Sequence, residues 1–220
     1  MLDLIFSRQT DIFVWLAYML SVAVVVFLST PIHEFAHAIS AVKLGDPTPK
    51  YMGRTTLNPF AHIDNLGALL ILLFGFGWAK PVQVNARNFK NPKGGMAITA
   101  LAGPVSNVLV ALLFYILLKG SINFGILSSN FGVYVFYFLK FIIQINISLA
   151  VFNLIPIPPL DGSRILAAVL PDRIYYSLMQ YERYFSFILI FLIATDALDY
   201  PINFLYNAVY SLLDLLTFWI

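Results

Sequence analysis

Seventeen uncharged residues, I-F-V-W-L-A-Y-M-L-S-V-A-V-V-V-F-L at 12–28, run directly into S-T-P-I-H-E-F-A-H-A-I-S at 29–40. Such a run approaches the roughly 18–20 residues that cross a bilayer core as a helix. We therefore expect a membrane span that carries two histidines and a glutamate at its end. Ionisable groups at membrane depth cost about 2.5–3.5 kcal/mol each on insertion scales, and they usually mark function.

The composition of the whole chain agrees with a membrane protein. Of its 220 residues, 60% are hydrophobic and 11% are charged, whereas roughly 25% are charged in an ordinary soluble domain. Further uncharged runs lie at 65–79, 96–118, 120–139, 141–160, 184–195 and 200–213. The sequence predicts an α-helical polytopic protein of the cell membrane with about five to six hydrophobic segments in the lipid bilayer. Residues 1–220 are expected to form a single membrane-embedded domain.

Several other classes of protein are disfavoured by what the sequence lacks. The chain has no cysteine, so disulfides and thiolate metal sites are excluded. Its net charge of +2 is too small to suggest a nucleic-acid partner. Residues 1–11 contain Asp3, Arg8 and Asp11 and show no signal peptide.

Helix boundaries predict the course of the chain. The first helix should begin near Asp11 and end at about Leu44, with Gly45 as its stop and Pro31 as a kink. The polar residues 45–64 are expected to form strand or loop. Further segments are predicted as a partial or re-entrant piece at 65–79, a short strand near 80–85, helices at about 95–118, 131–155 and 161–170, and hydrophobic segments near 182–196 and 200–218.

Positive charges predict the orientation. Residues 45–95 contain six Lys or Arg, whereas residues 119–139 contain only Lys119. The first region should therefore be cytoplasmic. Two helices that cross out and back then return P-I-P-P-L-D-G, residues 156–162, to the side where H-E-F-A-H lies. We expect the active site toward the cytoplasmic side.

The H-E-F-A-H segment has the spacing of a zinc site. His33 and His37 are four residues apart, so on a helix their side chains differ by about 40° and can bind one ion. Glu34 is turned about 100° from His33, within reach of a water on that ion. In H-E-x-x-H sites the histidines hold Zn²⁺ and the glutamate is the general base. The alternative is a polar cluster on a helix end that faces a pore or the interface.

A hydrolytic zinc site needs a third protein ligand and leaves one position for water. The soluble motif H-E-x-x-H-x-x-G-x-x-H does not continue here, because Ser40 and Lys43 occupy its glycine and histidine positions. Asp161 directly follows the uncharged stretch 141–160 and is the favoured ligand. Its alternative role is the N-cap of a helix over 162–170.

Two asparagines raise separate questions. Asn153 precedes three prolines that interrupt the backbone, and its amide could donate to the oxyanion of a tetrahedral intermediate. It could instead cap a carbonyl of the broken helix. Gly103 with Ser106 and Asn107 is expected to give close helix packing with a polar contact, and whether Asn107 faces the site stays open.

These motifs resemble the site-2 protease family of intramembrane zinc metalloproteases, in its compact prokaryotic form without a PDZ or CBS domain. The resemblance covers about residues 29–170, and residues 171–220 add hydrophobic segments that match nothing specific. It is carried by H-E-F-A-H at 33–37, L-N-P-F-A-H-I-D at 57–64, F-G-W-A-K-P-V-Q-V-N at 76–85, A-G-P-V-S-N at 102–107 and N-L-I-P-I-P-P-L-D-G at 153–162.

The resemblance implies one zinc ion per chain, held by His33, His37 and Asp161, with Glu34 as general base and Asn153 assisting the oxyanion. It also implies that the substrate is a transmembrane protein, cleaved within or beside its membrane segment, as in regulated intramembrane proteolysis.

A helical substrate must unwind before cleavage, and an extended peptide could then pair with a strand edge. The segments 51–58 and 80–85 are candidates for that edge, and plain loops are the equal alternative. The third histidine, His62, is expected to make an interfacial hydrogen bond rather than bind the catalytic zinc.

A metal-ion transporter or channel that uses the same histidines as a transit site is the alternative function. Such a protein needs ligands stepped along a pathway, and the runs 96–118, 120–139 and 184–195 contain no histidine or glutamate. An inactive relative that serves as a scaffold is a third possibility, although every residue type that the chemistry requires is present. Substrate identity, gating and oligomeric state cannot be read from the sequence.

Overall fold

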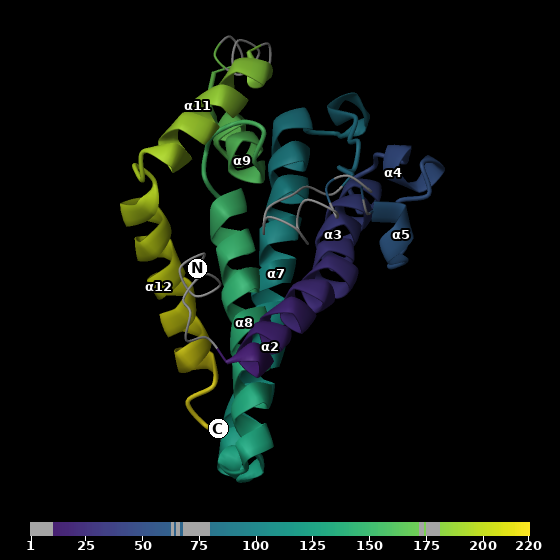
Figure 1. Cartoon of the computed structure of the whole chain (residues 1–220). Helices are drawn as coiled ribbons and strands as arrows, with labels where there is room; N and C mark the ends of the chain where they lie inside the picture. The colour runs from purple at the N-terminus through teal and green to yellow at the C-terminus, as the bar shows by residue number, and fades with distance from the viewer. Residues whose placement is uncertain (1–10, 63, 65–66, 68–79, 172–173, 175–180) are drawn as a thin grey trace.

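The computed structural model describes residues 11–62, 64, 67, 80–171, 174 and 181–220 (Figure 1). Its elements are α2 (Ile12–Val24), the π-helix η1 (Val25–Ser29), α3 (Thr30–Lys43), α4 (Thr48–Tyr51), α5 (Pro59–His62), η2 (Ala86–Asn88), α7 (Pro92–Asn123), η3 (Ile126–Ser128), α8 (Asn130–Asn153), α9 (Asp161–Val169), α11 (Glu182–Ala194) and α12 (Asp199–Leu216). No strand occurs among the described residues. The strands expected near 51–58 and 80–85 are therefore not confirmed, since both segments consist of helix ends, bends or irregular backbone.

Among the described residues, three continuous helices are long and apolar enough to cross a membrane: Ile12–Lys43, Pro92–Asn123 and Phe131–Asn153. The helices Tyr184–Ala194 and Asp199–Leu216 are bent by 84° and make a fourth crossing if they act as one span. A helical membrane architecture is thus confirmed, whereas the expected five to six segments are not. The partial segment predicted at 65–79 lies outside the described residues, apart from Gly67.

The first long helix has the predicted ends. The side chain of Asp11 caps its start, and Gly45 follows its last turn with a φ of +110°. Its interior contains η1, where the N–H of Thr30 bonds a carbonyl five residues back. Pro31 comes next, and because proline has no N–H, the ordinary four-residue ladder cannot resume at once. A π-helical turn therefore lies just before H-E-F-A-H, next to the proline at which a kink was expected.

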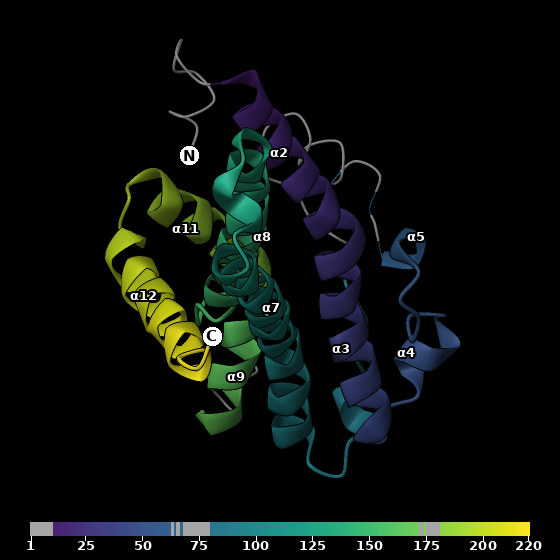
Figure 2. The ribbon, with the colours of Figure 1, turned by 90° about the horizontal axis from the view of Figure 1, so that it is seen from below.

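The helices are arranged around the long pair formed by α7 and α8. The first helix crosses this pair, so that α2 packs against α8 and α3 against α7 (Figures 1 and 2). On the other side, α12 covers an apolar core formed by Ala111, Tyr115, Leu118, Leu139, Ile143, Ile147, Val151 and Leu213. The short helix α9 also packs against α7. Both α3 and α9 therefore lie on α7, which brings their functional residues together.

Candidate metal centre

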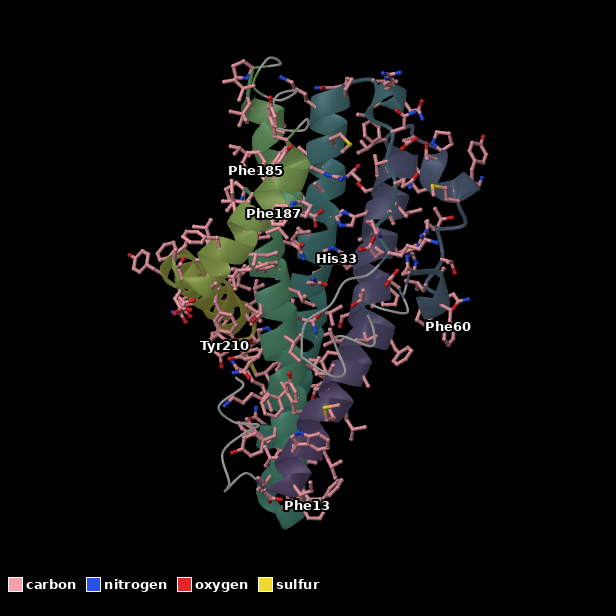
Figure 3. The ribbon with its side chains drawn as sticks, turned by 45° about the horizontal axis from the view of Figure 1, so that its top comes forward. Phe13, His33, Phe60, Phe185, Phe187 and Tyr210 are labelled. Carbon is pink, nitrogen blue, oxygen red and sulfur yellow. The ribbon has the colours of Figure 1, made fainter. Side chains whose placement is uncertain are left out.

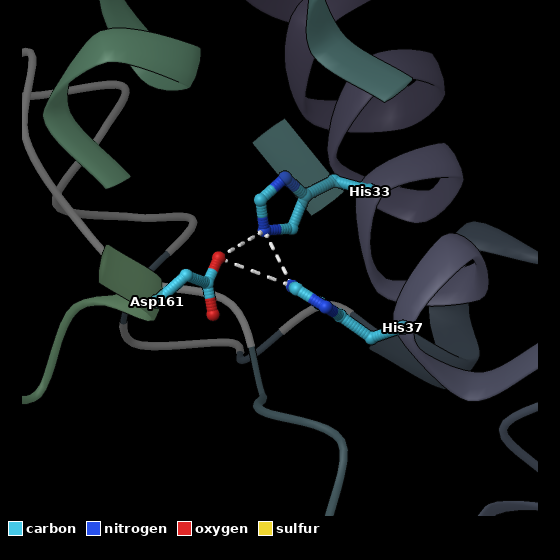
Figure 4. A group of neighbouring side chains, drawn as sticks. All are labelled: His33, His37 and Asp161. Carbon is cyan, nitrogen blue, oxygen red and sulfur yellow. Dashed lines mark hydrogen bonds and ion pairs between the residues drawn. The ribbon is translucent and has the colours of Figure 1, made fainter. Parts of the chain in front are cut away.

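Two imidazoles from α3 and a carboxylate from the start of α9 form a tight triangle (Figure 4). His33 Nε2 and His37 Nε2 lie 3.0 Å apart. Asp161 Oδ2 lies 3.4 Å from His33 Nε2 and 3.2 Å from His37 Nε2. Ligand atoms around a tetrahedral zinc, at about 2.0–2.2 Å from the metal, are about 3.3 Å from one another. The triangle therefore fits one zinc ion with the fourth position open.

Hydrogen bonding shows that His37 turns an acceptor atom toward the centre of this triangle. His37 Nδ1 lies 2.7 Å from the carbonyl oxygen of Thr99, which can only accept a hydrogen bond. The proton of a neutral His37 is therefore on Nδ1, and its Nε2 carries a lone pair. A carboxylate oxygen of Asp161 is an acceptor as well. A cation stabilises such a set, and these three residues are the one group in the described part of the chain that could hold a metal.

Two glycines permit this close approach. A methyl group at Gly103 on α7 would overlap both histidine rings. A methyl group at Gly162 would overlap the backbone at Leu154 and Ile155, where α8 has ended. Close packing at Gly103 was predicted and is confirmed, and its partner is the histidine pair itself.

Asp161 does not act as a helix cap. It is the first residue of α9, and Leu160 occupies the N-cap position without a side-chain hydrogen bond. The carboxylate of Asp161 turns toward the histidines instead (Figure 4). A negative charge in the first turn of a helix is also favoured by the helix dipole.

Glu34 lies outside the triangle, beside His33 in the chain. Its Oε2 accepts a hydrogen bond of 3.1 Å from the backbone N–H of Val82, and its side chain is buried. This bond places the irregular 80–85 segment against the carboxylate. It uses one of the two carboxylate oxygens.

Asp46 ties the same segment to the end of α3, a role that no motif predicts. Its buried carboxylate accepts hydrogen bonds from the N–H of Asn85 at 2.7 Å and from the side-chain amide of Asn88 at 2.6 Å. Burial alone raises the pKa of Asp46, but hydrogen bonds from Thr48 and these two asparagines outweigh burial and hold the pKa below its ordinary value. Asp46 and Glu34 thus fix both ends of the short segment from Val82 to Asn85.

Asn153 and His62 each make a hydrogen bond to a backbone carbonyl. The side-chain amide of Asn153 donates to the carbonyl of Leu149 at 2.9 Å, which is the carbonyl cap considered as its alternative role. That bond uses one of two amide hydrogens. His62 makes the expected hydrogen bond, with Nε2 2.7 Å from the carbonyl oxygen of Thr56, and it is fully buried in the protein. It does not belong to the candidate metal group.

Besides Asp46, two further supporting residues were missed by sequence reasoning. The carbonyl of Thr99 orients His37, and a backbone group carries no residue-type signature. The buried guanidinium of Arg54 donates to the carbonyls of Ala61 and Lys80, which joins the loop after α4 to the segment that reaches Glu34. Its partners are again backbone atoms, so only an arginine in an otherwise small, polar loop could have drawn attention to it.

Membrane-spanning helices, an H-E-x-x-H helix and a converging aspartate together are the features of a membrane metallopeptidase. Residues 21–194 match Peptidase family M50, and the chain belongs to this family. The predicted relationship to the site-2 proteases is thereby confirmed.

Three curated relatives, each named "Putative zinc metalloprotease", are similar to this chain. YwhC of Bacillus subtilis is 38% identical over 194 residues, which cover 88% of this chain and 89% of YwhC. Rip2 of Mycolicibacterium smegmatis is 28% identical over 179 residues, covering 78% and 66%, and MJ0611 of Methanocaldococcus jannaschii is 37% identical over 106 residues, covering 46% and 49%. No solved structure matches the chain significantly. The protein is a membrane peptidase of a zinc metalloprotease family.

Proposed function

We propose that this protein is an intramembrane zinc metalloendopeptidase that hydrolyses peptide bonds within or near transmembrane segments of membrane proteins. The observation that carries the proposal is the convergence of His33 Nε2, His37 Nε2 and Asp161 Oδ2, separated by 3.0 to 3.4 Å. These residues would hold one Zn²⁺ per chain and leave the fourth position for water or substrate.

The remaining residues support a general acid–base mechanism. Zinc at this site would polarise the scissile carbonyl and lower the pKa of a water to about 7. Glu34, oriented by the N–H of Val82, would take the proton of the attacking water and pass it to the leaving amine. Asn153 would offer its second amide hydrogen to the oxyanion of the tetrahedral intermediate.

We further propose a multi-pass arrangement in the cell membrane with the site toward the cytoplasm. The end of α3 and the start of α9 lie toward the same end of the bundle (Figure 1). The chain between 45 and 95, with six Lys or Arg, follows α3 directly. Residues 1–220 would work as one domain, and the substrate would be a membrane protein cleaved by regulated intramembrane proteolysis.

The alternative of a metal-ion transporter or channel is less well supported. A transit path needs successive ligand groups along its length. Within the described residues, His33, His37 and Asp161 form the one group of three or more metal-binding side chains. Membership of a peptidase family also favours hydrolysis.

Glu34→Gln in the purified full-length protein separates these functions. An amide cannot accept the proton, so cleavage of a transmembrane substrate should fall by about 10²–10⁴-fold while zinc stays bound. Asp161→Ala should lose zinc together with activity. A Glu34→Gln variant that cleaves at the wild-type rate, or an Asp161→Ala variant with full zinc content, would contradict the assignment.

A further inference from the structure

Seven buried side-chain polar atoms have no hydrogen-bond partner among the described residues. Four of them are Ser29 Oγ, His33 Nδ1, Asn107 Oδ1 and Asn146 Oδ1, and the others belong to His62, Thr99 and Asp161. Ser29, Asn107 and Asn146 are at most 1% exposed, and His33 is 8% exposed. A buried polar atom that has left water without gaining a partner destabilises the fold. These four atoms come from the first long helix, α7 and α8. They therefore indicate that their side chains share a partner.

The contacts between α3 and α7 place Asn107 level with Ser29. The two helices run antiparallel, since His37 meets Thr99 and both histidine rings meet Gly103, one turn further along α7. One more turn on each helix brings Ser29 and Asn107 to the same level. Ser29 lies one turn before His33 on the first helix, and Asn107 lies one turn after Gly103 on α7. Both are therefore on the side of His33 that is away from His37.

Asn146 belongs to α8, the helix that packs against α2 and η1. The hydroxyl of Ser21 donates to the carbonyl of Phe138 at 2.9 Å, and the rings of Phe13 and Tyr134 are 5.1 Å apart. These helices therefore run parallel. Ser29 lies eight residues after Ser21, and Asn146 lies eight residues after Phe138. Ser29 is the last residue of η1, which is in contact with α8.

We propose that Ser29, Asn107 and Asn146 enclose a small polar pocket behind His33, in which Asn107 orients the His33 ring through a buried water. The proposal rests on the proposed zinc site. A histidine that binds a metal with one ring nitrogen usually donates from the other to a carbonyl, a carboxylate or a water. His37 has the carbonyl of Thr99 for this purpose. His33, which lies between α3 and α7 (Figure 3), has no such acceptor among the described residues.

A water in this pocket satisfies all four groups at once. Buried waters make about three hydrogen bonds to polar groups that otherwise lack partners. The water accepts from His33 Nδ1–H and donates to Asn107 Oδ1, while Ser29 and Asn146 complete its shell. The tautomer of His33 is then fixed with its Nε2 lone pair toward Asp161. Asn107 is thus a positioning residue that acts on the metal through His33.

The test measures zinc affinity, by competition with a chelator, in the purified full-length protein. Asn107→Leu should lower the affinity by about 10–100-fold and change the visible absorption of the Co²⁺-loaded protein. Asn107→Asp keeps an acceptor oxygen and should recover most of the affinity. Asn146→Leu should weaken zinc binding in the same direction.

Ser106→Ala is the matched control. Ser106 is adjacent in the chain and buried, but its hydroxyl already donates to the carbonyl of Gly103 at 2.7 Å, so zinc affinity should not change. The proposal is overturned if Asn107→Leu binds zinc within twofold of the wild type, or if Asn146→Leu does. Failure of the proposed function looks different, because the wild type itself would then bind no zinc at the histidines.

Discussion

Replacing Gly103 by alanine should displace the histidine pair, because α7 passes directly over both rings. The added Cβ would lie 2.6 Å from Cε1 of His33, whereas nonbonded carbons sit about 3.5–4.0 Å apart. The overlap is therefore about 1 Å. The ring of His37 cannot turn aside freely, since its Nδ1 is bonded to Thr99 of the same helix. Either α7 retreats or the ligand triangle opens.

The loss follows from the size of this displacement. A shift of about 1 Å at a catalytic constellation costs roughly 100-fold in rate, which corresponds to about 2.7 kcal/mol of transition-state stabilisation. We expect kcat/KM for a transmembrane substrate to fall by about this factor in Gly103→Ala. Zinc affinity should fall as well, because the ligand atoms themselves move. Cleavage in reconstituted membranes and competition with a zinc chelator give the two readouts.

A second glycine on α7 provides the control. A Cβ at Gly120 would meet no atom within 4 Å, so Gly120→Ala should leave cleavage and zinc affinity unchanged. The helix itself should gain about 0.5–1 kcal/mol from this change. If Gly103→Ala cleaved and bound zinc as the wild type does, the packing argument would be refuted.

Three further predictions concern the residues around the site. Asp46→Asn should free the 85–88 segment at a cost of about 1–3 kcal/mol, seen as hydrogen exchange at the N–H of Asn85 that is about tenfold faster or more. Because the pKa of Asp46 is lowered, this anchor is fully present above its unfolded pKa of about 4 and is lost only as the pH falls through the lower folded pKa; loss of protection already near pH 5 in the wild type would count against it. Asn153→Ala should lower kcat by about 100-fold with zinc content and KM retained. An unchanged kcat would mean that the only role of Asn153 is to cap the carbonyl of Leu149. Removal of zinc by a chelator should abolish cleavage, and added Zn²⁺ should restore it; activity that survives complete removal would exclude zinc from the reaction.

The features that could be predicted from the sequence depend on local chemistry. Asp11 and Gly45 mark the ends of the first helix because capping and a positive φ are properties of single residues. The spacing of His33 and His37 fixes their common face on any helix. Asp161 was identified because two imidazoles leave a zinc site incomplete, and the structure places its carboxylate beside them.

The features that escaped prediction depend on partners far apart in the chain. The sequence predicted a short strand near 80–85, but a local pattern of apolar residues does not show which partner each N–H finds. Here the N–H of Val82 bonds Glu34 and the N–H of Asn85 bonds Asp46, so side chains take the place of a neighbouring strand. The position of Asn107 behind His33 likewise follows from the register of two helices, which no local pattern encodes.

The most direct test of the central claim is anomalous diffraction at the zinc absorption edge from crystals of the full-length protein. We predict a single peak in the triangle, about 2.0–2.2 Å from His33 Nε2, His37 Nε2 and an oxygen of Asp161. A zinc peak elsewhere, or a peak at the histidines with the Asp161 carboxylate turned away, would contradict the account.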